Sequence, residues 1–474
     1  MKPRDVGTWR DTWADVRRSF ADFLAVPSAT VAAFLLLAVG TYLLDRHTVG
    51  WLEPTRSFLK HRLITDPDTT DTLLGAIAGG VITVTSITFS LLLLAVQQSA
   101  AALTSQVLDQ FLRRRLNQVY FGVFIGVSLF VLLTLATNDT RVTPVFGSAV
   151  ALLATLGAMV VLVLLLYTTL NQMRPDRIIE AIHDLTLAAR LDQRSMLART
   201  RAEPALRSAP ATFTLRSSTS GYVATVDLDR IGKAAQAAPG ETEVVLLVAL
   251  GDYVCYHDPL AEIAAPTSEA ARAIGKATRA ALSLERQRNL RRDPGYGISQ
   301  LAGVGWTAIS TAKSNPAPGL SAIRHLRDIL IRWMEDERTV RGDASDRTAP
   351  IPVVYRDDVT QKLLSAFESL LIVASESMQH QSAAEVYRSI AAVLDRLPPA
   401  LQDRAEDVIL RSLSALGDHV PARDLDDALR EVTIALAKAG RAHAAGKVET
   451  ARLALAASIG VIGARGARGV KRAG

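Results

Sequence analysis

The sequence predicts an α-helical membrane protein, in which four transmembrane helices are followed by a cytoplasmic α+β region with a small β domain and a helical C-terminal domain. Three observations lead to this class. The mean hydropathy of the 474 residues is positive, at +0.20. Nearly all long apolar runs precede Met173, and the rest of the chain mixes Ala and Leu with charged residues as soluble proteins do. Within that second part, residues 213–266 contain alternating runs rich in β-branched residues, a pattern that predicts β-strands.

Four apolar stretches reach the roughly 20 residues that an α-helix needs to cross a hydrocarbon core. They cover residues 28–44, 73–102, 119–136 and 145–170. The first lies too far along the chain, and lacks the small-residue cleavage site, for a signal peptide. We therefore divide the chain into a cytoplasmic N-terminal segment (1–27), a four-helix transmembrane domain (28–171), a helical connector (172–212), a small β domain (213–266), a helical cytoplasmic domain (267–464) and a basic disordered tail (465–474).

The distribution of Lys and Arg orients the helices. Five basic residues precede the first span, three arginines lie between the second and the third, and only Arg141 separates the third from the fourth. Because loops rich in Lys and Arg stay in the cytoplasm, both termini are expected to be cytoplasmic. Arg outnumbers Lys and Ala is abundant, a composition typical of GC-rich bacteria. The expected location is the inner membrane of a bacterial cell, with the lipid bilayer as the first partner.

The predicted β domain consists of strand-like runs separated by Gly, Asp and Pro turns. Two of these runs, SGYVATV and VALGDYVCYHDPLAEI, resemble the strand pattern of biotinyl and lipoyl domains. That resemblance implies a compact barrel-sandwich over residues 213–266. No lysine occupies the tip of a central hairpin, so we expect neither a lipoyl nor a biotinyl group. The sequence predicts no other cofactor and no metal site.

From Ser268 onward the spacing of apolar residues is helical, apart from a short extended segment, IPVVY, at residues 351–355. Prolines interrupt the helical series at residues 397–399 and 420–421. The series predicts helix hairpins without a repeat period. The closing ARGARGVKRAG is basic and glycine-rich, which is typical of a disordered tail.

The sequence contains no catalytic constellation. The eight histidines form no pair at metal-ligand spacing, no glycine-rich loop resembles a phosphate cradle, and Ser90 lacks the flanking glycines of a nucleophile elbow. Tyr253, His257 and Asp258 lie close together, but their GDYVCYHDP context is typical of turn and edge residues.

The single cysteine, Cys255, excludes intramolecular disulfides. A net charge of +6, with arginines interleaved among acids, argues against nucleic acid as a partner. We therefore predict neither an enzyme nor a nucleic-acid-binding protein.

The second span carries an unusual polar stripe. At about 100° per residue, its small and polar residues fall within an arc of roughly 80°. They are Gly75, Gly79, Thr83, Ser86, Ser90, Gln97 and Thr104. The stripe has two interpretations: it packs against another helix, or it faces water. Gln97 favours the second, because an unpaired amide in lipid costs several kcal/mol. No helix breaker occurs before Phe111, so the helix is expected to continue through residues 73–113 and to leave the membrane.

In the channel hypothesis, copies of this helix surround a symmetry axis and line a water-filled pore, so the protein is a homo-oligomer. The candidate pore-lining residues are Thr83, Ser86, Ser90 and Gln97, the candidate hydrophobic gate is Leu93 and Leu94, and the candidate inner-mouth charges are Arg113, Arg114 and Arg115. The alternative is a membrane-anchored sensor or scaffold whose cytoplasmic domain binds a protein or a small ligand. A stripe buried within one four-helix bundle favours the alternative, and a stripe that faces an oligomer axis favours the channel.

Three groups of motifs follow one another in an order that resembles a known family. They are FSLLLLAVQQSAAALTSQVLDQFLRRRLNQVYFGVFIG, the pair SGYVATVDLD and GDYVCYHDPL, and RRDPGYGISQLAGVGWTAIS followed by SNPAPGLSAI. Together they resemble the bacterial predicted membrane proteins grouped as domain of unknown function 2254. The sequence departs from that family at KSNPAP, where Asn315 and Pro316 match only loosely. The resemblance implies the architecture described above and no particular activity, substrate or cofactor.

Overall fold

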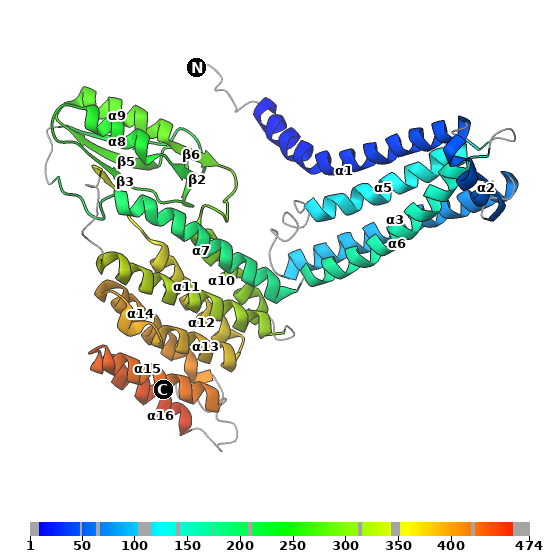
Figure 1. Cartoon of the computed structure of the whole chain (residues 1–474). Helices are drawn as coiled ribbons and strands as arrows, with labels where there is room; N and C mark the ends of the chain where they lie inside the picture. The colour runs from blue at the N-terminus through cyan, green and yellow to red at the C-terminus, as the bar shows by residue number, and fades with distance from the viewer. Residues whose placement is uncertain are drawn as a thin grey trace. The chain divides into compact units, whose positions relative to one another are not determined.

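The chain divides into two compact units at the boundary between Arg174 and Pro175. The computed structural model describes residues 9–47, 50–62, 67–102, 115–138, 143–172, 174–206, 211–310, 315–342, 351–418 and 422–457. The described part of the N-terminal unit is helical, and the C-terminal unit combines helices with strands (Figure 1). The boundary falls where the hydropathy of the sequence changes. The predicted tail, at residues 465–474, lies outside the described residues.

Among its described residues, the N-terminal unit has four helices that are long and apolar enough to cross a membrane, over Leu24–Arg46, Asp68–Ser90, Arg115–Ala136 and Val145–Thr169. This confirms the prediction of four spans. The spans belong to α1 (Trp9–Arg46), α3 (Pro67–Ala102), α5 (Arg115–Ala136) and α6 (Val145–Gln172). A 3-10 turn, η1 (Gly50–Leu52), and the short helix α2 (Glu53–Arg62) lie between α1 and α3.

The first helix is longer than the predicted span, which starts at residue 28. It begins at Trp9 and continues through Pro27. The apolar run sets the length of a span, but the backbone hydrogen bonds of a helix also form in water, so the charged residues before the span extend the same helix. A proline inside a helix removes one of these hydrogen bonds and favours a bend. Figure 1 shows α1 bent along its length.

Helix α5 contacts α1, α3 and α6, and two of its glycines meet α1. A Cβ atom added to Gly126 would lie 2.3 Å from Phe34 Cδ2, and one added to Gly122 would lie 2.6 Å from Thr30 Cβ. Glycines spaced four residues apart let two helices approach closely in a membrane. This GxxxG seam joins the first and third spans.

A buried carboxylate connects α1 with the start of α6. Asp45 is only 4% exposed, and it accepts hydrogen bonds from the backbone N–H groups of Phe146 and Gly147, both at 2.9 Å. The first N–H groups of a helix have no partner within the helix, and its N-terminus attracts negative charge. Asp45 therefore caps α6 from a neighbouring helix.

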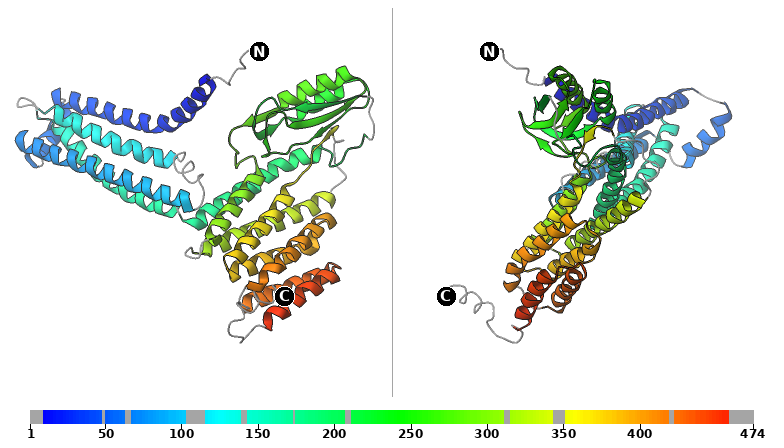
Figure 2. Two further views of the ribbon diagram at one scale, coloured as in Figure 1. Left: turned by 180° about the vertical axis from the view of Figure 1, so that it is seen from behind. Right: turned by 90° about the vertical axis from the view of Figure 1, so that its left-hand side faces the viewer.

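The described part of the C-terminal unit contains two small open sheets. One has the strand order β1 (Ala211–Arg216), β5 (Pro259–Ala265), β3 (Glu243–Leu246) and β7 (Val353–Val354). The other has the order β4 (Tyr253–Val254), β2 (Gly221–Val226) and β6 (Leu282–Glu285). Neighbouring strands are antiparallel, except for the parallel pair of β3 and β7. Helices α8 (Leu228–Ala237) and α9 (Ser268–Ala281) pack side by side (Figure 2). Ile231 and Ile274 belong to one hydrophobic core with residues of the strands.

The predicted barrel-sandwich over residues 213–266 is wrong in shape. The sheets are open, α8 interrupts this segment, and β6 and β7 come from outside it. Alternation in a sequence indicates which residues can form a strand, but the partner of the strand depends on side-chain packing across the sheet. Val244 pairs with Val353, which lies more than 100 residues further along the chain.

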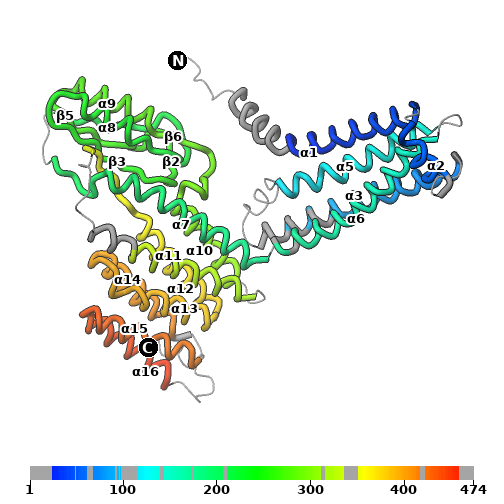
Figure 3. The backbone as a smooth tube through the Cα atoms, viewed as in Figure 1, coloured from blue at the N-terminus to red at the C-terminus, as the bar shows by residue number. Residues whose placement is uncertain are grey.

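The remainder of the C-terminal unit is built from packed helices. α7 (Pro175–Arg199) contacts α10 (Pro294–Ser310) and α11 (Ala317–Gly342). The series continues with α12 (Val359–Glu376), α13 (His380–Ala391), η3 (Leu394–Arg396), α14 (Pro399–Ser412), η4 (Leu413–Asp418), α15 (Arg423–Lys438) and α16 (Ala442–Ala456). Alternate helices also contact one another, because α10 packs on α12, α11 on α13 and α13 on α15 (Figure 3).

Candidate functional site

The polar stripe of the second span lies on the outside of the N-terminal unit. The side chains of Thr83, Ser86, Ser90 and Gln97 are exposed. Cβ atoms added to Gly75 or Gly79 would meet no described atom within 4 Å. The stripe is therefore not a packing seam within the described four-helix bundle.

A different face of α3 packs into the bundle. Its buried side chains are Thr70, Leu74, Ala78, Val81 and Thr88. At about 100° per residue, the centre of this buried face lies roughly 140° around the helix from the centre of the stripe. The two faces point in nearly opposite directions. The helix thus buries a face of apolar residues and two threonines, and presents the polar stripe on its exposed face.

Two hydroxyl groups of the stripe bond to their own helix. Thr83 Oγ1 donates to the carbonyl of Gly79 at 2.7 Å, and Ser90 Oγ donates to that of Ser86 at 3.0 Å. Such bonds to the preceding turn satisfy the hydroxyl protons inside a membrane. The hydroxyl oxygens keep lone pairs that can still accept hydrogen bonds from outside the helix.

The candidate gate lies on the same helix. Leu93 is 54% exposed and Leu94 is 51% exposed. Of the candidate inner-mouth charges, Arg115 is the exposed first residue of α5. Arg113, Arg114 and the last residue of the stripe, Thr104, lie outside the described residues, as does the predicted continuation of the helix beyond Ala102.

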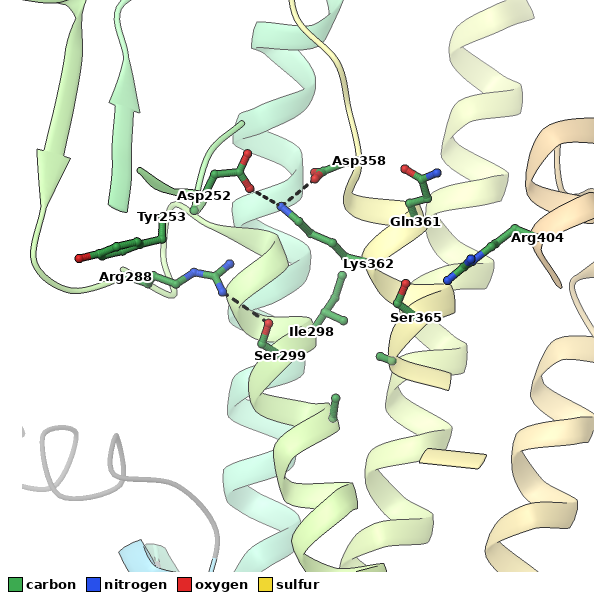
Figure 4. A pocket seen from close by; sticks show the side chains of 13 residues that line it. Asp252, Tyr253, Arg288, Ile298, Ser299, Asp358, Gln361, Lys362, Ser365 and Arg404 are labelled. Atoms are coloured by element: carbon green, nitrogen blue, oxygen red, sulfur yellow. Dashed lines mark hydrogen bonds and ion pairs between the residues drawn. The ribbon is translucent and has the colours of Figure 1, made fainter. Parts of the chain in front are cut away.

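The C-terminal unit contains a cavity of about 750 Å³. Its walls come from the turn between β3 and β4, the loop before α10, α10 itself, α12 and α14 (Figure 4). Its polar lining consists of Asp252, Tyr253, Arg288, Ser299, Asp358, Gln361, Lys362, Ser365 and Arg404. None of these side chains was a candidate site residue in the sequence.

A tight turn places the first carboxylate of the cavity. Gly251 has a φ of +83°, and a Cβ atom added to it would lie 2.1 Å from Asp293 Oδ2. Only glycine adopts this conformation and permits this approach without strain. The next residue, Asp252, accepts a hydrogen bond from the backbone N–H of Ala249 at 2.8 Å. The turn therefore fixes the Asp252 carboxylate at the cavity wall.

The DPGYGIS motif fixes an arginine beside this turn. Asp293 is buried and caps α10, because its Oδ1 accepts a hydrogen bond from the backbone N–H of Tyr296 at 2.9 Å. Its Oδ2 accepts one from Arg288 Nε at 2.7 Å. The Arg288 guanidinium carbon also lies 4.8 Å from the centre of the Tyr296 ring. Pro294 occupies the first helical position, where a missing N–H costs nothing.

Lys362, on the first turn of α12, lies between the carboxylates of Asp252 and Asp358. Its Nζ is 3.0 Å from Asp252 Oδ1 and 2.9 Å from Asp358 Oδ2 (Figure 4). Burial opposes the charge, but the hydrogen bonds and charges of the two carboxylates outweigh it and raise the pKa of Lys362. Burial raises the pKa of Asp358, against the lowering effect of Lys362. Asp358 Oδ1 is buried and accepts no hydrogen bond from any described residue.

The segment that leads into α12 is anchored from two directions. Arg190, on α7, is 3% exposed and donates to both carboxylate oxygens of Asp357, at 3.0 and 2.6 Å. The hydroxyl of Tyr355 accepts a hydrogen bond from the backbone N–H of Leu250, next to the turn described above. Burial raises the pKa of Tyr355, so this phenol stays protonated. These contacts hold Asp358 and the start of α12 against the turn.

His257 and Asp258, which lie close to Tyr253 in the sequence, have structural roles. His257 has a φ of 73°, and Asp258 Oδ2 accepts a hydrogen bond from the backbone N–H of Cys255 at 2.7 Å. Both residues belong to the turn between β4 and β5, whereas Tyr253 lines the cavity. Across the described residues, no group of three or more His, Cys, Asp or Glu side chains is positioned to hold a metal ion.

Four spanning helices and a second unit of mixed α and β structure define a multi-pass membrane protein. The chain belongs to the family described as predicted membrane protein (DUF2254), whose pattern matches residues 21–383, more than half of the chain. This confirms the resemblance carried by the sequence motifs. The matched range contains the polar stripe and all cavity-lining residues except Arg404. No curated protein and no solved structure gives a match.

Proposed function

We propose that the protein forms a homo-oligomeric membrane channel lined by α3, and that it is not an enzyme. The observation that carries this proposal is the orientation of the polar stripe, which faces away from the other helices of its own bundle. In this proposal the stripes of several copies surround one axis and face water, while the apolar outer faces of the bundle contact lipid.

The energetics of polar groups in a membrane support this arrangement. Gln97 is exposed, and its amide loses several kcal/mol in hydrocarbon without a partner. The open space beside Gly75 and Gly79 lets another helix approach the α3 backbone closely. A closed ring of copies supplies both a partner for the glycines and a wet interior for the polar side chains.

Leu93 and Leu94 give the proposed pore a closed state. They follow Ser90 and precede Gln97 on the same helix, and about half of each side chain is exposed. A ring of leucines can stop ion flow by expelling water from a narrow segment. The arginines at 113–115 would then bias the inner mouth toward anions. In this proposal both termini are cytoplasmic, as the distribution of basic residues predicts.

Gly79→Leu is expected to reduce the oligomeric mass of the protein in lipid nanodiscs. A Cβ atom added to Gly79 meets no described atom within 4 Å, so the fold should persist, but a leucine would separate copies that approach through α3. Native mass spectrometry measures the result. Gly80→Leu is the matched control, because Gly80 also has open space around it but lies about 100° around the helix from Gly79. A monomeric wild type, or equal masses for both variants, contradicts the proposed assembly.

Leu93→Ser is expected to make liposomes leak ions. A polar residue at the constriction favours the wetted, conducting state. Flux is measured for the purified protein with and without membrane tension. Leu164→Ser is the control, because Leu164 is a 47% exposed leucine on α6, outside the stripe. If Leu93→Ser assembles normally and passes no more ions than empty liposomes, the channel proposal fails.

The cavity of the C-terminal unit favours a second candidate function. A membrane-anchored sensor needs a binding site for its signal, and the cavity combines charged side chains from several elements. The sensor and the channel differ in their membrane part: the sensor requires neither ion flux nor a ring of α3 helices. Flux and native mass, measured on one preparation, distinguish the two functions.

A further inference from the structure

Three cationic side chains from three separate elements reach the cavity of the C-terminal unit. Arg288 comes from the loop before α10, Lys362 from α12 and Arg404 from α14, where it extends toward Ser365 (Figure 4). Arg288 and Arg404 are more than 100 residues apart in the sequence. Tertiary folding alone brings these charges to one cavity.

Each cation is held in place by a carboxylate and keeps unused hydrogen-bonding capacity. Asp293 fixes Arg288 at 2.7 Å, and Glu368 fixes Arg404 at 2.9 Å. A guanidinium has five N–H donors and an ammonium has three, so these contacts leave donors available in each group. Positioned guanidinium groups suit the oxygens of a phosphate, which they contact through paired N–H donors.

The lining disfavours a cationic ligand. Lys362 already occupies the position between Asp252 and Asp358, within 3.0 Å of each, so a second cation would have to displace it. The volume of about 750 Å³ lies in the usual range for small-molecule sites, about 300–1,000 Å³. The cationic lining and the volume therefore favour a small anionic molecule.

We propose that this cavity binds a small phosphate ester. Its phosphate contacts donors of the cationic lining that the carboxylate partners leave unused. Sugar phosphates, nucleotides and the glycerol phosphate of lipid headgroups share this chemistry. The site lies wholly within the C-terminal unit and does not depend on the proposed channel.

Isothermal titration calorimetry with the full-length protein in nanodiscs tests the proposal. The probes are ribose 5-phosphate, adenosine 5′-monophosphate and glycerol 3-phosphate, and the controls are adenosine and inorganic phosphate. At least one probe is expected to bind, adenosine is not, and inorganic phosphate should bind more weakly than the best probe. The tightest probe identifies the source of the ligand. The absence of heat for all three probes at millimolar concentration overturns the proposal, as does equal binding of adenosine or of inorganic phosphate.

Three variants locate the binding. Ser365→Trp fills the cavity from an exposed position on α12 without breaking a charge pair, and should abolish binding. Arg404→Gln and Lys362→Met should each weaken it roughly tenfold through the loss of a charge-assisted hydrogen bond. Lys438→Met removes an exposed ion pair with Asp395, outside the cavity, and should leave binding unchanged. Wild-type affinity in a folded Ser365→Trp protein contradicts the assignment of this cavity.

Discussion

Gly126→Leu is expected to destabilise the N-terminal unit by about 3 kcal/mol, because overpacking of a tight contact forces backbones apart. Even a single Cβ atom at this position would lie 2.3 Å from Phe34 Cδ2 on α1. Neighbouring Gly122 meets Thr30 in the same seam, so the helices cannot slide to relieve the clash. The midpoint of thermal unfolding in detergent should fall, and hydrogen exchange should rise first in α1 and α5.

Gly157→Leu serves as the matched control for this seam. Gly157 lies on α6, is exposed, and has no described atom within 4 Å of an added Cβ. The same substitution there should leave the unfolding midpoint and the exchange of α1 and α5 near those of the wild type. Similar losses in both variants would mean that the effect comes from leucine in a membrane helix and not from the seam.

Arg190→Met is expected to destabilise the C-terminal unit by about 3 kcal/mol, because it leaves the partly buried Asp357 carboxylate without its partner. The side chain of Arg190 also lies 5.1 Å from the ring centre of Trp333, a cation–π contact that methionine cannot make. Thermal unfolding of the full-length protein measures the loss. Hydrogen exchange should increase in α7 and in residues 355–358, which lead into α12.

An exposed ion pair on the same helix provides the control. Arg177 pairs with Glu180 at 3.1 Å, with more than half of each side chain exposed, so Arg177→Ala should change stability by less than about 1 kcal/mol. In the double variant Arg190→Met and Asp357→Leu, no charge is left unpaired, and much of the stability should return. If Arg190→Met unfolds like Arg177→Ala, the buried pair does not anchor this segment.

The membrane architecture could be predicted from the sequence because hydropathy is a local property. A run of about 20 apolar residues must cross the bilayer as a helix, whatever its neighbours are. The four spans, their approximate positions and the change of character near Met173 all follow from this rule. The start of α1 at Trp9 could not be predicted from this rule, because hydropathy does not mark where a helix begins outside the membrane.

The sequence predicts which residues share the polar face of the candidate site in the membrane, but not the direction in which that face points. Helical periodicity places Thr83, Ser86 and Ser90 on one face of α3, since it depends only on the spacing of residues. Which way that face points depends on which other face is buried. Leu74, Ala78 and Val81 pack into the bundle and turn the stripe outward, a choice that involves side chains of α5 and α6.

The cavity could not be predicted, although the sequence contained two of its parts. GDY and DPGYGIS were visible as motifs, but Lys362 and Arg404 lie in ordinary helical sequence without a local pattern. The strand order of the sheets could not be predicted for the same reason, because β7 pairs with β3 although more than 100 residues separate them. The sequence by itself therefore determined the spans, the helical faces and the turn at Gly251, because each depends on neighbouring residues. Only the tertiary structure decided the strand partners, the outward direction of the stripe and the meeting of three cations in one cavity, because long-range packing sets these.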